Sequence, residues 1–385
     1  MKQAIAGRTV LILKPSFSTR FSTELLKTFT IRYHFFGSSR TIGFRIAFPK
    51  KFNFLLVCSL PQNLWNKLSV STRSQLALSL SPRVIMDFPH RDALSEMKQL
   101  ILNADDFGMT RGVNEGIIRA YRNGILTSTT LMANGAEFDD AVASAKLNPG
   151  LGVGCHLVLV GGPAVACREK ISSLVDEDGN LPESLGLFVA RLTAGLIRSK
   201  AIEREMRAQI EKIRAAGIEP THLDTHKHTH AHPKVMESLA RVGKALGITR
   251  VRKPMENLRD SWQSTRGDKN SSHTLELIAA AAARTVTPWF QAIVRNYGLL
   301  TPNNFLGLAM TGSLGPAALR RMIDTLPDGS TEIMLHPGIC DDDLAKSGSR
   351  LQIHRVAEMS ALLDPAVKST FVERDIRLIS YRELN

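Results

Sequence analysis

Apolar runs alternate with amphipathic stretches along the chain from about residue 98 to the C-terminus. The first run, residues 100–102, is continuous and rich in branched side chains, which is typical of a buried strand. Val113 and Ile117 then recur at helical spacing until Asn123-Gly124 ends the pattern. Strands that alternate with helices in this way predict a mostly parallel α/β sheet or barrel.

The same pattern predicts the remaining elements of the chain. Further strands are expected at 125–133, 151–159, 248–252, 305–310, 332–338 and 376–380, with another strand end within 221–232. Further helices are expected at 139–147, around 202–213, and at 233–246, 279–294, 316–326 and 351–363. Two stretches carry no such period: residues 161–186 are expected to form a long loop, and residues 256–273 a flexible insertion.

Residues 1–97 differ in composition from the rest and form a basic N-terminal extension. Before Met97 the chain carries 14 Lys and Arg against 4 Asp and Glu, so ten of the 13 net positive charges lie there. The remainder is too weakly basic to indicate nucleic-acid binding. The longest apolar run of the extension, residues 52–60, is far shorter than the roughly 20 residues that span a bilayer, so we expect no transmembrane segment.

Three interpretations of this extension stay open: a targeting or surface-binding arm, a poorly structured appendage, or upstream sequence included through a wrong start codon. We favour the third, because Met86 and Met97 both precede the first clear strand. A transit peptide is also poor in acidic residues and rich in Arg and Ser. The predicted division is therefore an extension at 1–97 and an α/β domain at 98–385.

The four cysteines are scattered along the chain, at Cys58, Cys155, Cys167 and Cys340, without a C-x-x-C pair. This spacing argues against a zinc ribbon and against a disulfide framework. A reducing cytoplasm is therefore the location that we expect.

Two adjacent carboxylates, Asp105 and Asp106, lie where the first strand runs out. The C-terminal ends of strands are where α/β folds usually place their chemistry. Neighbouring carboxylates repel unless a cation or a proton separates their charges, so the pair suits a metal on one and a base on the other. Taken alone, a solvated turn is the more common origin of such a pair.

Histidines recur at the ends of other predicted strands: His156, the cluster His226–His232, and His336. Singly, these could be a buried core histidine, a chance histidine-rich turn and a turn residue. In an extended chain, however, the side chains at 226, 228 and 230 would share one surface. Their convergence with the Asp pair at one mouth of a parallel barrel would give a divalent metal its ligands. The sequence therefore predicts a metal-dependent hydrolase.

Five short motifs stand out together within the stretch from Lys98 to the C-terminus: Asn103–Gly108, Thr127–Thr129, Gly154–Leu157, Thr221–His230 and Leu378–Leu384. In combination they resemble the YdjC-like carbohydrate deacetylases, a family that includes the chitooligosaccharide deacetylases. The resemblance implies a distorted (β/α) barrel of the polysaccharide-deacetylase-like type. It also implies removal of an N-acetyl group from an amino sugar, with release of acetate.

The resemblance implies a role for each residue at the strand ends. Asp106, His156 and His226 would hold one divalent metal ion, Mg²⁺ or Zn²⁺, and Asp105 would be the general base. Such an ion lowers the pKa of a bound water and polarises the acetamide carbonyl.

Proton donation and substrate binding are assigned to the neighbouring residues. His336 falls where related deacetylases keep their general acid, with His228 as the other candidate donor. We assign His228, His230 and Arg252 to substrate binding. The family pattern leads us to expect a His or another neutral residue at position 227, where this chain has Lys227. We expect this positive charge to change which substrate charge the site prefers.

The expected partner is an N-acetylated sugar, either an oligosaccharide or a glycolipid, and the chain could act as a homodimer. The loop 158–162 and the segment 301–308 look more like the hopanoid-biosynthesis-associated branch of the family than its chitobiose branch.

Two rival functions stay open at this point. A metal-dependent phosphoesterase or glycosidase could use the same ligands, and Arg250, Arg252 and Lys253 offer a basic cluster for phosphate. A non-catalytic sugar-binding protein could also carry the same barrel, because a fold does not determine a function.

Overall fold

The computed structural model describes residues 26–35, 38–47, 98–256 and 285–385. The predicted insertion at 256–273 lies, after its first residue, outside the described residues, as does the first part of the predicted helix 279–294. The chain divides into two compact units, Met1–Asp92 and Ala93–Asn385. Each unit is described by itself.

The first unit contains one pair of strands among its described residues. Strand β1 (Leu26–Phe35) pairs antiparallel with β2 (Ser38–Ala47) in a two-stranded sheet. The sequence pattern did not predict this pair. The division between residues 97 and 98, and the three interpretations of the extension, stay predictions.

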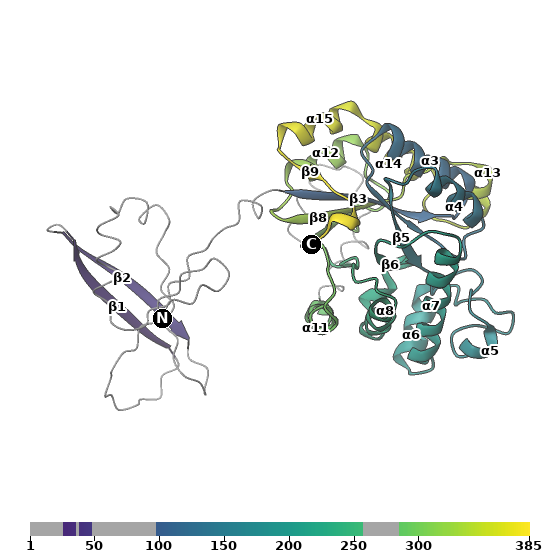
Figure 1. Cartoon of the computed structure of the whole chain (residues 1–385), viewed down its shortest axis with the longest axis horizontal. Helices are drawn as coiled ribbons and strands as arrows, with labels where there is room; N and C mark the ends of the chain where they lie inside the picture. Colours follow the sequence, from purple (N-terminus) through teal and green to yellow (C-terminus); the bar gives the residue numbers. More distant parts are fainter. Residues whose placement is uncertain (1–25, 36–37, 48–97, 257–284) are drawn as a thin grey trace. The chain divides into compact units, whose positions relative to one another are not determined.

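The second unit is built on one sheet in which every strand pair is parallel. Its strands are β3 (Gln99–Phe107), β4 (Ser128–Leu131), β5 (Gly152–Leu157), β6 (Leu223–Thr225), β7 (Asn304–Leu306), β8 (Ser330–Leu335) and β9 (Arg377–Leu378). Their order is β6-β5-β4-β3-β8-β7, and β9 pairs with β3 (Figure 1). Residues 100–102 of β3 and 332–335 of β8 are fully or almost fully buried. Because neighbouring residues of a strand point to opposite faces, both faces of these central strands are covered.

Two single-residue bridges extend this sheet beyond its named strands. Leu223 of β6 bridges to Val251, and Arg250 bridges to Leu300, four residues before β7 at the other edge. The predicted strand 248–252 is present only as these bridges. Because they link the chain at one edge to the chain near the other, the sheet curls round, and the distorted barrel predicted from the sequence is confirmed.

Helices surround the sheet and follow its strands along the chain. They are α3 (Arg111–Asn123), α4 (Phe138–Lys146), α5 (Arg168–Ile171), α6 (Leu185–Thr193), α7 (Ser199–Ala215), α8 (Pro233–Ala245), α11 (Thr287–Tyr297), α12 (Pro316–Asp324), α13 (Asp342–Lys346), α14 (Ile353–Leu363) and α15 (Pro365–Glu373). Two short 3₁₀ helices, η1 (His226–Ala231) and η2 (Tyr381–Glu383), complete the described elements. Helices α7 and α8 pack side by side (Figure 1).

Four of these helices were not predicted. α5 lies inside the expected loop 161–186, and α6, α13 and α15 were absent from the predicted pattern. α6 carries apolar residues on its exposed side as well as its buried side, so no polar face reveals its period. α13 and α15 are capped by the side chains of Asp341 and Asp364. These caps are local start signals that the periodicity of hydrophobic residues does not contain.

The extended histidine cluster was a wrong prediction. After β6 ends at Thr225, the chain turns into η1, and both Lys227 and His228 have left-handed backbones with φ of 56° and 51°. Alternate residues share a face only in an extended chain. The side chains of His226, His228 and His230 therefore do not line one strand surface.

A close backbone contact packs α3 against the loop that follows β8. A Cβ atom on Gly116 of α3 would lie 2.5 Å from Gly338 Cα, and the nearest neighbouring atoms belong to the backbone. Backbone atoms cannot rotate away as a flexible side chain can, so only glycine fits at position 116. A Cβ on Gly186 of α6 would meet nothing within 4 Å.

We predict that Gly116→Ala lowers the free energy of unfolding by about 1–3 kcal/mol, the usual cost of overpacking a close contact. Gly186→Ala is the matched control, because it makes the same change inside a helix where there is open space. It should leave stability unchanged or raise it by up to about 1 kcal/mol. Urea unfolding of the full chain measures both, and equal stabilities for the two variants would contradict the packing described here.

Candidate functional site

The C-terminal ends of β3, β5 and β6 bring three of the predicted site residues together. Asp106 Oδ1 lies 3.2 Å from His226 Nδ1 and 3.5 Å from His156 Nε2, and the two histidine nitrogens are 3.2 Å apart. One ligand atom from each of Asp106, His156 and His226 can be chosen so that all lie within 4.8 Å of one another. One carboxylate and two imidazoles are a donor set that suits a catalytic divalent metal, with room for a further ligand.

An irregularity in β3 places both adjacent carboxylates at the site. Neighbouring residues of a regular strand point to opposite faces. The pairing of β3 with β4 shifts register between Ala104 and Phe107, and Asp106 has a left-handed backbone with φ of 68°. Asp tolerates this conformation better than most residues, although it remains uncommon. The strand end is therefore bent at the point where Asp105 and Asp106 enter the site.

Asp105 is held by a bidentate ion pair beneath the predicted ligands. Its two carboxylate oxygens lie 2.6 Å and 2.7 Å from the terminal nitrogens of Arg252. Burial alone would raise the pKa of Asp105, but the charge of Arg252 and then that of His156 hold it well below its usual value. Asp105 is therefore ionised at neutral pH.

Arg252 is the centre of a larger buried network. Its side chain is 0% exposed, and besides Asp105 it bonds Asp224 at 2.6 Å and Glu332 at 2.8 Å. The hydroxyl of Tyr381 donates to the other oxygen of Glu332. The guanidinium of Arg252 is thus engaged by carboxylates of the protein itself, and it also lies 5.5 Å from the centre of the Phe305 ring. The predicted role of Arg252 in substrate binding stays a prediction.

Asp224 is a site residue that the sequence analysis did not single out. Its Oδ1 lies 2.8 Å from His156 Nδ1, which leaves Nε2 of this ring for Asp106 and His226. Such a carboxylate fixes the orientation and tautomer of a metal-binding histidine. Burial would lower the pKa of His156, but Asp224 and Asp105 raise it to about 10. The position of Asp224 two residues before His226, on the same strand end, was the signal available in the sequence.

Helix α14 contributes two more residues that the sequence analysis missed. Arg355 Nη2 lies 2.6 Å from Asp106 Oδ2, and the Glu358 carboxylate accepts a hydrogen bond from the backbone N–H of His336. Both side chains are buried. Two charged residues one turn apart, on a helix face whose other buried residues are apolar, were the signal that could have revealed them.

His336 follows β8 and reaches the same end of the barrel as Asp105. Its Nδ1 lies 3.8 Å from Glu358 Oε2 and has no hydrogen-bond partner among the described residues. The proximity of His336 contributes to the lowered pKa of Asp105. Its predicted role as general acid stays a prediction.

Two further histidines of the cluster, His228 and His230, contact other side chains of the protein. His230 Nδ1 lies 2.6 Å from the Thr225 hydroxyl oxygen, and His228 packs edge-on to Phe305. Burial first, and then the charge of Arg252, lower the pKa of His228 to about 3, so this ring is neutral. The predicted substrate contacts of His228 and His230 stay predictions.

The site carries more acidic than basic groups. The groups paired with arginine are four carboxylates and two guanidiniums, all buried: Asp105, Asp106, Asp224, Glu332, Arg252 and Arg355. A histidine binds a metal only as the neutral ring, and with His156 and His226 in that form and these carboxylates ionised, two negative charges are unbalanced. Buried charges need compensation, and one divalent cation supplies the amount required.

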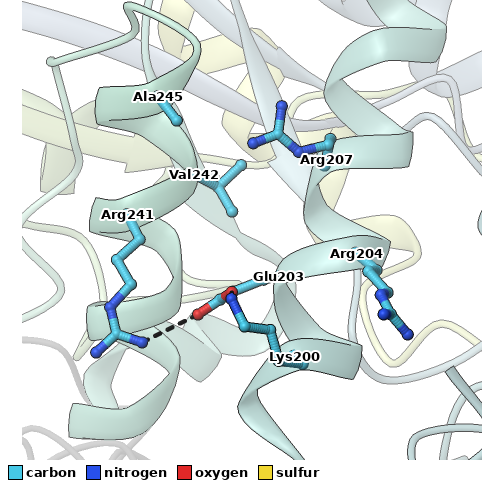
Figure 2. A pocket seen from close by; sticks show the side chains of 7 residues that line it. All are labelled: Lys200, Glu203, Arg204, Arg207, Arg241, Val242 and Ala245. Atoms are coloured by element: carbon cyan, nitrogen blue, oxygen red, sulfur yellow. Dashed lines mark hydrogen bonds and ion pairs between the residues drawn. The ribbon is translucent and has the colours of Figure 1, made fainter. Parts of the chain in front are cut away.

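A separate groove lies on the outer surface between α7 and α8. It has a volume of about 490 Å³ and is lined by Lys200, Glu203, Arg204, Arg207, Arg241, Val242 and Ala245 (Figure 2). Figure 2 shows Arg241 reaching across to Glu203, and their ion pair measures 3.1 Å. None of the predicted site residues lines this groove.

We predict that Arg252→Met lowers the free energy of unfolding by about 3–5 kcal/mol, because three buried carboxylates lose their shared cation. Arg241→Met is the control: it also removes an arginine that pairs with two carboxylates, but its side chain is 49% exposed. Exposed pairs contribute about 0–1 kcal/mol, so this variant should change little. Urea unfolding tests both, and an Arg252→Met chain as stable as the control would refute the network's role.

Comparisons with known proteins show the family of this chain and support its fold. The sequence model of the YdjC-like protein family matches residues 99–373. A carbohydrate deacetylase of Geobacillus stearothermophilus is 36% identical over 285 residues, which cover 74% of this chain and 96% of that protein. A chitooligosaccharide deacetylase of Yersinia enterocolitica is 35% identical over 288 residues, which cover 74% of this chain and 99% of that protein.

A solved structure supports the architecture. It is the crystal structure of a protein of Enterococcus faecalis V583 described as a candidate cellobiose-phosphate cleavage protein, with 25% sequence identity and a TM-score of 0.60. The match covers 74% of this chain and 98% of that one. The predicted hopanoid-associated branch stays a prediction. The match to the family model over most of the chain, together with relatives above 30% identity, shows that this chain belongs to the YdjC-like protein family.

Proposed function

We propose that this chain is a metal-dependent carbohydrate N-deacetylase, which hydrolyses the N-acetyl group of an amino sugar and releases acetate. The observation that carries the proposal is the meeting of Asp106, His156 and His226 from the ends of three parallel strands, with the ionised Asp105 next to Asp106 in the chain. The names of the relatives, carbohydrate deacetylase and chitooligosaccharide deacetylase, support the same chemistry.

The residues at the site fit a divalent ion, Mg²⁺ or Zn²⁺. Asp106, His156 and His226 would hold it, and the two unbalanced negative charges of the network favour a divalent over a monovalent cation. Asp105 with its lowered pKa is a weak base, so it needs a water whose own pKa has been lowered, and such an ion supplies this while polarising the acetamide carbonyl.

In this proposal Asp105 accepts the proton of the attacking water. The water oxygen forms a bond to the acetamide carbon, and the tetrahedral intermediate then breaks its carbon–nitrogen bond. Arg252 keeps the Asp105 carboxylate ionised and in place through two hydrogen bonds. The products are acetate and a free amino sugar.

His336 donates the proton to the departing amine. Its Nδ1 has no hydrogen-bond partner among the described residues, so this nitrogen is available to a substrate. His228, the other candidate, is packed against Phe305 near Arg252, whose positive charge opposes a protonated ring.

The phosphoesterase alternative finds less support in the structure. Its basic cluster is occupied by the protein's own groups: Arg250 donates to the carbonyl of Leu384, Lys253 to that of Asn303, and Arg252 to buried carboxylates. Parallel assays of acetate and phosphate release on N-acetylated and phosphorylated sugars separate the two functions.

For the substrate we propose only a chemical class. We infer an N-acetylated sugar, with oligosaccharides and glycolipids as the two forms to assay; a homodimer and a cytoplasmic location stay predictions. Among the described residues, no helix is both long and apolar enough to cross a bilayer.

We predict that Asp105→Asn retains bound metal and slows acetate release by about 10²–10⁴-fold, because Asn cannot accept the proton of the water. Asp324→Asn, at an exposed ion pair with Arg374, is the control and should leave turnover unchanged. Metal analysis and an acetate-release assay on N-acetylglucosamine oligomers measure both properties. Turnover that persists in the Asp105 variant would exclude this residue as the base.

We also predict that His336→Gln slows deacetylation of an N-acetyl sugar by about 10²–10⁴-fold but affects an aryl acetate ester far less. The ester's leaving group departs without a proton, so it does not need the donor. His228→Gln should slow the amide reaction less than His336→Gln does. The opposite ranking would assign the proton donor to His228.

A further inference from the structure

Two buried ionisable side chains on α14 have no part in the reaction steps proposed above. Arg355 and Glu358 lie one helical turn apart, and each is 1% exposed. Ionisable groups are seldom buried without a specific partner, because burial removes their solvation. Their partners are Asp106 and the His336 backbone, at the two functional ends of the site.

Arg355 occupies one of the two oxygens of Asp106. Its Nη2 lies 2.6 Å from Asp106 Oδ2, and its Nε donates to the carbonyl of Leu351 at 3.0 Å. The guanidinium is thus fixed at two points. Oδ1, the other oxygen, is the one that faces His156 and His226.

Glu358 fixes the backbone of His336. Its Oε2 accepts from the His336 N–H and its Oε1 from the Gly312 N–H at 3.0 Å, so the carboxylate joins two loops at the mouth of the barrel. The same Oε2 is 3.8 Å from the His336 ring. The helix is itself joined to this loop, because Gly338 N donates to the Arg355 carbonyl at 3.3 Å.

Resting on the function proposed above, we propose that Arg355 and Glu358 are positioning residues with separate tasks. Arg355 confines Asp106 to ligation through a single oxygen, and Glu358 holds the His336 ring at the leaving group. A carboxylate can bind a metal through one oxygen or two. With Oδ2 committed to Arg355, a coordination position stays open for water and substrate, as a catalytic site requires.

The strained backbone of Asp106 gives a reason for such a strong clamp. A left-handed backbone at a residue other than glycine persists only where its surroundings hold it. The ion pair with Arg355, 249 positions away along the chain, provides that hold. The positive charge of Arg355 repels a metal cation, so Arg355 does not help to attract the metal. Its contribution is to hold the Asp106 carboxylate in one orientation.

The test of Arg355 uses Co²⁺ as the probe, because its visible absorption reports coordination number. In Arg355→Gln we expect Asp106 to bind through both oxygens: Co²⁺ affinity equal to or tighter than that of the unmodified chain, weaker absorption bands, and kcat lowered about 10–100-fold. Arg355→Lys, which retains a cation, should give a spectrum closer to that of the unmodified chain. Circular dichroism confirms that each variant is folded.

The test of Glu358 measures a different property of the same protein. In Glu358→Gln we expect an unchanged Co²⁺ spectrum, an unchanged KM, and a kcat about tenfold or more lower on an N-acetyl sugar, with a smaller loss on an aryl acetate ester. Arg374→Gln, at the residue that follows helix α15, makes the same change as Arg355→Gln at an exposed ion pair, and it should alter neither the spectrum nor turnover.

The outcomes separate this inference from the function on which it rests. A folded Arg355→Gln chain that loses Co²⁺, or that shows the unmodified spectrum, overturns the role of Arg355. If the Co²⁺ spectrum of Glu358→Gln changes in the same way as that of Arg355→Gln, the two residues support the same part of the site and do not have separate tasks. That result overturns the proposal. An unmodified chain that binds no metal and releases no acetate refutes the proposed function itself.

Discussion

The structure of the barrel mouth depends on one buried cation, the guanidinium of Arg252. It bonds carboxylates from three strands, Asp105 of β3, Asp224 of β6 and Glu332 of β8. Without it, three negative charges would share a volume from which water is excluded, at a cost of several kcal/mol each. This one side chain therefore permits the acidic strand ends to approach one another, and it orients Asp105 and, through Asp224, the His156 ring.

The excess of acidic groups around this cation gives the site its chemistry. Arg252 and Arg355 together balance only two of the four carboxylates that they pair with. Asp224 and Asp105 raise the pKa of His156 against the effect of burial. The net negative charge makes the cluster of Asp106, His156 and His226 attractive to a divalent ion. Stability and the proposed function therefore depend on the same charges. The two arginines neutralise part of the negative charge of the carboxylates, and the part that remains suits a divalent metal ion.

The convergence of the candidate residues could be predicted from the sequence because parallel strands end at one edge of a barrel. That geometry, read from Asp105, Asp106, His156 and His226, needs no knowledge of side-chain contacts. The sequence does not reveal the left-handed backbone of Lys227 and His228. Histidines at alternate positions are compatible both with an extended strand and with a 3₁₀ turn, so the pattern does not distinguish the two. The partners of Arg252 and Arg355 were equally hidden, since they lie up to 249 positions away along the chain. Missed helices such as α15 begin with local capping signals that hydrophobic periodicity does not contain.

The central claim is that side chains from three strand ends bind one divalent ion. Native mass spectrometry of the full chain, after equilibration with Zn²⁺ and desalting, tests it most directly, with His226→Ala compared against His354→Ala at an exposed position on α14. We predict one ion per chain in the unmodified protein and in His354→Ala, and none in His226→Ala. An ion retained equally by all three proteins, or bound by none of them, would contradict the claim.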